Sequence, residues 1–152
     1  MNTNKTSIEI LLVDDDSDDR NTFKDALSEL KIGTNLTLLE DGRNLLEYLE
    51  NPDNKKPDIL FLDLNMPYKT GVECLIELRQ YSKFNDLSIA IYSTSSTDKD
   101  IEDTFINGAN IYIKKPNDFA KLKKILNDVV NMNFQFHNSG LNKETFLLNI
   151  NI

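Results

Sequence analysis

The sequence has 152 residues, of which 39% are hydrophobic, so it is long enough for one domain with a packed core and too apolar for a disordered chain. With 17 Lys and Arg against 25 Asp and Glu, its formal net charge is −8, which disfavours direct binding to nucleic acid or to an anionic membrane. A single Cys and a single His exclude a disulfide framework and a Cys/His zinc site, and neither a membrane span nor a signal peptide is visible, so we expect a cytoplasmic protein.

Short apolar runs alternate along the chain with helical patterns. Four runs are almost continuously apolar, as is typical of strands that are buried on both faces of a parallel sheet: Ile8–Val13, Ile59–Leu62, Ile89–Tyr92 and Ile111–Ile113. A fifth run, Leu36–Leu39, is interrupted by Thr37, which indicates a strand at the edge of the sheet. The runs therefore predict five strands.

Between the runs, apolar residues recur at helical spacing. Ser17 is expected to cap the first helix, and Gly33 is expected to end it. Four further helices are predicted around Leu45–Leu49, Val72–Leu78, Ile101–Phe105 and Phe119–Val129. Five β-α units in residues 8–131 predict a doubly wound α/β domain, in which helices cover both faces of a five-stranded parallel sheet.

The two ends of the chain are expected to lie outside this domain. Residues 1–7 are polar and predicted to be a disordered N-terminus. Residues 132–152 form an apolar C-terminal tail, which is too hydrophobic for a free linker. We expect this tail to fold back on its own domain, and the alternative is a contact in a homodimer.

Three carboxylates follow two of the predicted strands. Asp14 and Asp15 come directly after the first strand, and Asp63 ends the third. Ligands of open α/β sheets bind beyond the carboxyl ends of the strands, so these side chains converge if the first and third strands are neighbours. Because such a cluster of like charges needs a cation, and its ligands are hard oxygens, the pattern favours Mg²⁺ or Mn²⁺. The alternative is a solvated acidic loop.

Two other side chains end strands at the same edge of the sheet. Ser93 closes the fourth run, and Lys115 follows the fifth. A hydroxyl donor and an ammonium group beside carboxylates and a divalent cation are suited to bind the oxygens of a phosphoryl group.

At this point the sequence resembles a known family, the receiver domains of response regulators in two-component signalling. The motifs that carry the resemblance over residues 8–131 are Leu11–Asp15, Asp63–Pro67 with Gly71, the Ser93 hydroxyl, Gly108–Ala109, Tyr112 and Lys115–Pro116. The chain is most similar to the small single-domain regulators that are paired with phytochrome-type and other hybrid histidine kinases. The resemblance implies a flavodoxin-like sheet with strand order 2-1-3-4-5.

The resemblance also assigns roles at the acidic cluster. Asp63 would be the phosphorylated residue. Asp14 and Asp15 would hold Mg²⁺, with Mn²⁺ as a substitute, together with Asp63 and the backbone carbonyl of Asn65.

Further roles fall on the last two strands. Ser93 and Lys115 would bind the phosphoryl oxygens, and Tyr112 would be an aromatic switch that turns inward as Ser93 moves. Lys115–Pro116 would be a cis peptide. Thr94 is bulkier than the residue that usually stands at this position of the switch region, so it is expected to narrow access to the phosphorylated aspartate.

The function that this implies is that of a stand-alone phosphoacceptor rather than an enzyme. It would take a phosphoryl group from a sensor histidine kinase and change its contacts with a downstream protein target, without binding DNA or a membrane directly. Two alternatives remain: a small phosphohydrolase with an aspartate nucleophile at Asp14, and an interaction module that works without phosphorylation.

Overall fold

The computed structural model describes residues 7–136. Residues 1–6 and 137–152, which include most of the expected N-terminal segment and of the expected apolar tail, lie outside the described residues, so the expectations for the tail stay predictions.

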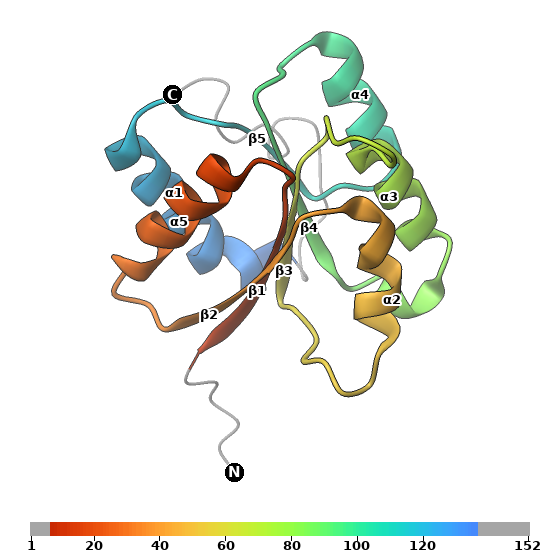
Figure 1. The fold of residues 1–152 in the computed structure, drawn as a ribbon, viewed down its shortest axis with the longest axis horizontal. Coiled ribbons are helices and arrows are strands. Elements are labelled where there is room, and N and C mark those ends of the chain that lie inside the picture. Colours follow the sequence, from red (N-terminus) through yellow and green to blue (C-terminus); the bar gives the residue numbers. More distant parts are fainter. Residues whose placement is uncertain (1–6, 137–152) are drawn as a thin grey trace.

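The described chain forms a sheet of five parallel strands flanked by helices (Figure 1). The strands are β1 (Ile8–Val13), β2 (Thr34–Leu39), β3 (Ile59–Leu62), β4 (Ser88–Ser93) and β5 (Ile111–Lys114). Their order is β2-β1-β3-β4-β5, so the predicted fold class and strand order are confirmed. Since β1 and β3 are neighbours, residues that follow them in the sequence meet at one edge of the sheet.

Burial explains why these segments are strands. Every residue of β3 and β4 is buried, whereas β2 has no fully buried residue. This difference is expected, because β3 and β4 are central strands that are covered on both faces, whereas β2 is an edge strand. It matches the difference between the continuous apolar runs and the interrupted run at Leu36–Leu39.

Two layers of helices cover the sheet. Helices α1 (Ser17–Ser28) and α5 (Phe119–Phe136) contribute to the hydrophobic core on one face, and α2 (Leu45–Glu50), α3 (Gly71–Arg79) and α4 (Asp98–Ile106) contribute to the core on the other (Figure 1). Short 3₁₀ helices, η1 (Gly42–Asn44) and η2 (Ser82–Phe84), precede α2 and β4. Within residues 7–136, none of the helices has the length and hydropathy that a membrane crossing requires.

The helix ends differ from the sequence-based expectations. Asp16, not Ser17, caps α1, because its backbone is extended and its carboxylate accepts a hydrogen bond from the Asp19 N–H at 3.0 Å. The helix ends at Ser28, well before Gly33. At the other end of the chain, α5 continues beyond residue 131 to Phe136, so the last helix extends into the segment that was assigned to the tail.

Candidate functional site

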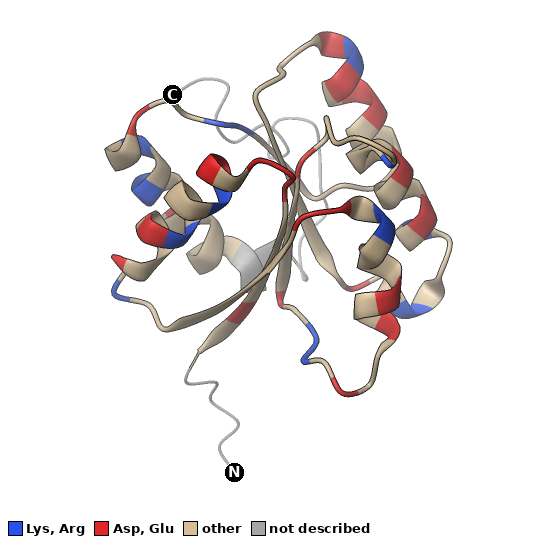
Figure 2. Ribbon diagram, in the orientation of Figure 1, with Lys and Arg blue, Asp and Glu red and all other residues tan. Residues whose placement is uncertain are grey.

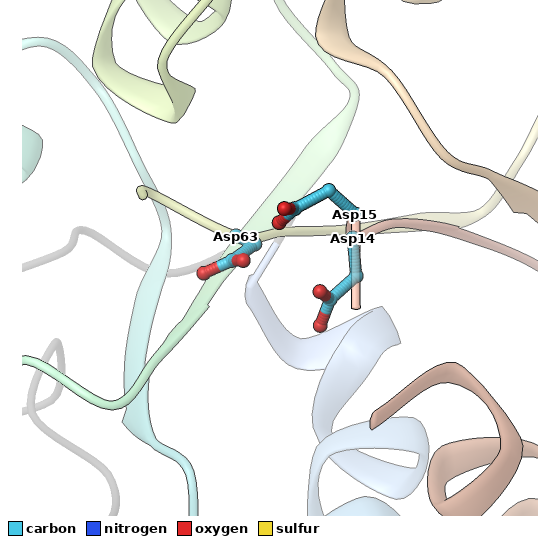
Figure 3. A group of neighbouring side chains, drawn as sticks. All are labelled: Asp14, Asp15 and Asp63. Atoms are coloured by element: carbon cyan, nitrogen blue, oxygen red, sulfur yellow. The ribbon is translucent and has the colours of Figure 1, made fainter. Parts of the chain in front are cut away.

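The register of the sheet brings the three aspartates together. Val13 pairs with Leu62, so Asp14 and Asp63 leave β1 and β3 at the same level. Figure 3 shows the side chains of Asp14, Asp15 and Asp63 gathered at this point, and one carboxylate oxygen of each lies within 4.8 Å of the others. Acidic segments from several parts of the chain meet along the same edge (Figure 2).

The three carboxylates differ in their access to solvent. Asp14 is 0% exposed and Asp63 is 5% exposed, whereas Asp15 is exposed. Successive side chains leave a strand in opposite directions, which is why neighbours in the sequence differ so strongly. Two buried carboxylates require compensation of their charge, and oxygen ligands with one open side suit a hydrated divalent cation. The residues present therefore fit a divalent metal ion.

A glycine shapes the loop behind Asp63. The N–H of Gly71 donates a hydrogen bond to the Leu64 carbonyl at 2.9 Å, which folds the β3–α3 loop back on the end of β3. A Cβ atom at position 71 would lie 2.2 Å from the carbonyl oxygen of Asp63, so only glycine fits here. Helix α3 then begins with a capping box between Thr70 and Glu73.

Lys115 reaches the cluster from the end of β5. Its Nζ atom lies 2.9 Å from Asp14 Oδ2, 2.7 Å from Asp19 Oδ2 and 3.7 Å from Asp63 Oδ2, and the Lys115 side chain is 8% exposed. Burial lowers the pKa of this ammonium, but the hydrogen bonds that it donates to Asp14 and Asp19 and the nearby charge of Asp63 outweigh burial and leave the pKa raised. The lysine is therefore a permanent cation in the site.

Asp19 is a member of this network that the sequence reasoning did not single out. It lies in the first turn of α1, three residues after the Asp16 cap. That turn starts at the same edge of the sheet as the carboxyl end of β1, and this placement was the signal that could have identified Asp19.

Burial raises the pKa of the Asp63 carboxyl to about 7, and the negative charge of Asp14 adds to the shift against the attraction of Lys115. One buried lysine thus does not fully compensate the carboxylates. An additional cation would favour the ionised form of Asp63, which is the form that can act as a nucleophile.

Ser93 lies at the end of β4, as predicted, and is fully buried. Its Oγ atom accepts a hydrogen bond from the Ser95 N–H at 3.1 Å. Thr94 between them is exposed. The effect of Thr94 on access to Asp63 stays a prediction, as does the metal-binding role of the Asn65 carbonyl.

Tyr112 is already inside the protein. It is 0% exposed, and its hydroxyl donates a hydrogen bond to the Ser95 carbonyl oxygen at 2.7 Å. The ring was expected to turn inward as Ser93 moves, but in this structure it is buried already. Ser95, which the sequence reasoning did not assign a role, contacts both Ser93 and Tyr112, and its hydroxyl also bonds to Asp100 of α4.

The expected cis peptide at Lys115–Pro116 is wrong, because residues 7–136 contain no cis peptide bond. The trans isomer is favoured by about 0.5–1 kcal/mol in X–Pro bonds, and Lys115 reaches Asp14 with the trans bond in place. The Lys115 N–H donates to the Ser93 carbonyl at 2.7 Å, which anchors this end of β5 beside β4.

The geometry disfavours the hydrolase alternative. Asp14 would have to be the nucleophile, but it is fully buried and its two carboxylate oxygens bind the Asp16 N–H and Lys115 Nζ. Asp63 has a weaker contact with the lysine, at 3.7 Å, and lies at the end of the neighbouring strand. Of the two buried aspartates, Asp63 is therefore the one available to react.

Comparisons with known proteins agree with this arrangement. The response regulator Rcp1 of Synechocystis sp. is 27% identical over 124 residues, which cover 79% of this chain and 84% of Rcp1. The probable methanogenesis regulatory protein FilR2 of Methanothrix harundinacea is 28% identical over 123 residues, which cover 79% of each chain.

Solved structures of response regulators are also similar to this chain. The phosphorylated cyanobacterial phytochrome response regulator RcpA is similar with a TM-score of 0.77 and 26% identity, over 84% of this chain and 94% of RcpA. The Mn²⁺-bound form of Rcp1 is similar with a TM-score of 0.73 and 26% identity, over 89% of this chain and 99% of that one.

The model of one family, the response regulator receiver domain, matches residues 10–127, a range that starts in β1, ends in α5 and includes all the site residues described above. With the strand order, the acidic cluster and the lysine in agreement, the chain belongs to the response-regulator receiver family.

Proposed function

We propose that this protein is a single-domain response regulator that accepts a phosphoryl group on Asp63 from a histidine of a sensor kinase. The observation that carries the proposal is the position of Asp63, which is 5% exposed, at the strand end beside two other carboxylates and 3.7 Å from the Lys115 ammonium. It would act as a phosphoacceptor rather than as an enzyme. The similarity to RcpA, a cyanobacterial phytochrome response regulator, supports a phytochrome-type kinase as the donor.

Mg²⁺ is the cofactor we propose, held by Asp14, Asp15, Asp63 and the backbone carbonyl of Asn65. The similarity to the Mn²⁺-bound form of Rcp1 supports a divalent cation, and Mn²⁺ would substitute for Mg²⁺. When bound, the cation would neutralise charge on the phosphoryl oxygens and on the carboxylates.

The protein's own groups would then bind the phosphoryl group. The Lys115 ammonium would donate hydrogen bonds to one phosphoryl oxygen, and the Ser93 hydroxyl would donate to another. Ser93 Oγ accepts a hydrogen bond from the Ser95 N–H, so rotation of this hydroxyl would affect the loop before α4. We propose that the altered loop and Tyr112 change the binding of a protein target, and that the protein does not act by binding DNA or a membrane.

The test is to identify the residue that forms an adduct. The protein is incubated with acetyl phosphate, with Mg²⁺ or with EDTA, and the labelled residue is located by trapping with borohydride and mass spectrometry. We expect Mg²⁺-dependent label on Asp63 and none in Asp63→Asn. Label on Asp14 would instead support the hydrolase, and the absence of label under every condition would support an interaction module that works without phosphorylation.

A further inference from the structure

We propose that Asp19 is a positioning residue that holds the Lys115 ammonium away from Asp63 and has to release it when a phosphoryl group is bound there. This inference rests on the proposed function. It adds a residue of helix α1 to the site formed by the strand ends. The carboxylate of this residue competes with the phosphoryl group for the Lys115 ammonium.

The distances show that Lys115 is shared unequally. Its Nζ atom is 2.7 Å from Asp19 Oδ2 and 2.9 Å from Asp14 Oδ2, but 3.7 Å from Asp63 Oδ2, which is beyond a normal hydrogen bond. The ammonium has three N–H donors, and two of them point to Asp14 and Asp19. The residue that is to be phosphorylated thus has the longest of the three contacts.

The surroundings of the ammonium limit where it can move. Nζ lies 5.2 Å from the centroid of the Tyr92 ring, and that ring packs edge-on against Phe23 in the core. The Lys115 side chain is 8% exposed, so it is enclosed by the ring and the carboxylates. To approach a phosphoryl oxygen on Asp63, Nζ therefore has to move away from one of its two present hydrogen-bond partners, even though its third N–H is available to donate.

Burial decides which partner is exchanged. The side chain of Asp14 is 0% exposed, so its carboxylate cannot turn to water to replace the Lys115 ammonium. The side chain of Asp19 is 39% exposed, so its carboxylate can turn to water when the lysine leaves. Asp19 is accordingly the partner that is released.

A matched pair of variants isolates this effect. Asp19→Asn removes the charge that holds Lys115 and retains the backbone N–H that bonds to the Asp16 cap. Asp18→Asn removes the same charge from the same first turn of α1, at an exposed position one residue away, and so reproduces the loss of interaction with the helix dipole. Asp19→Glu retains the charge on a longer side chain.

Each protein is labelled with acetyl phosphate at saturating Mg²⁺, and its affinity for beryllofluoride is measured by calorimetry, since the chain has no tryptophan to report binding. We expect Asp19→Asn to be labelled about 3- to 10-fold faster than the wild type and to bind beryllofluoride more tightly by a similar factor, because an anion that competes for the lysine is removed. Asp18→Asn should change both quantities less than 2-fold, and Asp19→Glu should be close to the wild type. Thermal unfolding and a second variant, Asp19→Ser, separate a loss of fold from a change at the site.

Equal labelling rates and beryllofluoride affinities for Asp19→Asn and Asp18→Asn, or slower labelling of Asp19→Asn than of the wild type, would overturn this inference. Label on Asp63 of the wild type would still leave the proposed function intact. A wild-type protein that takes no label at all would overturn both.

Discussion

Asp14 and Lys115 are 101 residues apart in the sequence and form a buried ion pair, with 2.9 Å between Asp14 Oδ2 and Lys115 Nζ. Asp14 is fully buried, and the Lys115 side chain is 8% exposed. This pair joins the end of β1 to the segment after β5, so it connects strands that are not neighbours in the sheet.

The ion pair predicts a specific effect on stability. Lys115→Met should lower the free energy of unfolding by about 3–5 kcal/mol in metal-free buffer, because it leaves the buried charge of Asp14 without its partner. Urea denaturation measures this. The matched control is Lys121→Met on α5, where the lysine is exposed and a change below about 0.5 kcal/mol is expected. If the two variants are equally stable, the pair does not compensate Asp14.

Asp63→Asn should remove phosphoacceptance and stabilise the metal-free protein in a pH-dependent way. The raised pKa of Asp63, about 7 against an ordinary value of 3.8, means that the carboxyl takes up a proton on folding at pH values between the two. Its contribution favours the folded state below about pH 4 and is lost as the pH rises through about 7. Relative to the wild type, Asp63→Asn should therefore gain about 1–3 kcal/mol at pH 8 and little at pH 4.

Denaturation curves of wild type and Asp63→Asn at both pH values, in EDTA, check that prediction. Asp25→Asn, at an exposed position of α1, serves as the control for a general charge effect. A stability difference between wild type and Asp63→Asn that is the same at pH 4 and pH 8 would contradict it.

Asp15→Ala should abolish Mg²⁺ binding and phosphorylation while leaving the fold intact. Asp15 is the exposed member of the cluster, so its removal takes a ligand away without opening a cavity in the core. Calorimetric titration with MgCl₂ measures the loss, and Asp18→Ala is the control for net charge. Metal affinity like that of the wild type in Asp15→Ala would remove this residue from the site.

Gly71→Ala should destabilise the protein by about 1–3 kcal/mol and slow the labelling of Asp63. The added Cβ would be 2.2 Å from the Asp63 carbonyl oxygen, so either the loop or the end of β3 has to shift. Thermal unfolding and acetyl phosphate labelling of the same sample check both effects. The control is Gly33→Ala, at an exposed glycine outside the left-handed region of φ, which should be nearly neutral.

Much of the fold followed from local patterns in the sequence. The apolar run Ile59–Leu62 is strand β3 residue for residue, and the runs at Ile8–Val13 and Leu36–Leu39 identified a central strand and an edge strand. Burial of a strand on both faces requires uninterrupted apolar residues, so this property is visible without the tertiary structure. Asp14 and Asp63 directly follow such runs. Because ligands bind beyond the carboxyl ends of the strands, these positions pointed to the acidic cluster.

The helix caps depended on local geometry that the sequence pattern leaves open. Asp16 and Ser17 are both suitable caps, and only the backbone conformation shows that Asp16 accepts the hydrogen bond from Asp19.

The ion pairs of the site were decided by the tertiary structure alone. Asp14, Asp15 and Asp19 lie within six positions of one another, yet Asp14 is buried on Lys115, Asp15 is exposed, and Asp19 reaches Lys115 from the first turn of α1. Local periodicity determines which residues are buried along one element. Contact between residues about a hundred positions apart depends instead on the strand order, the register of β1 with β3 and the direction in which each side chain leaves its element.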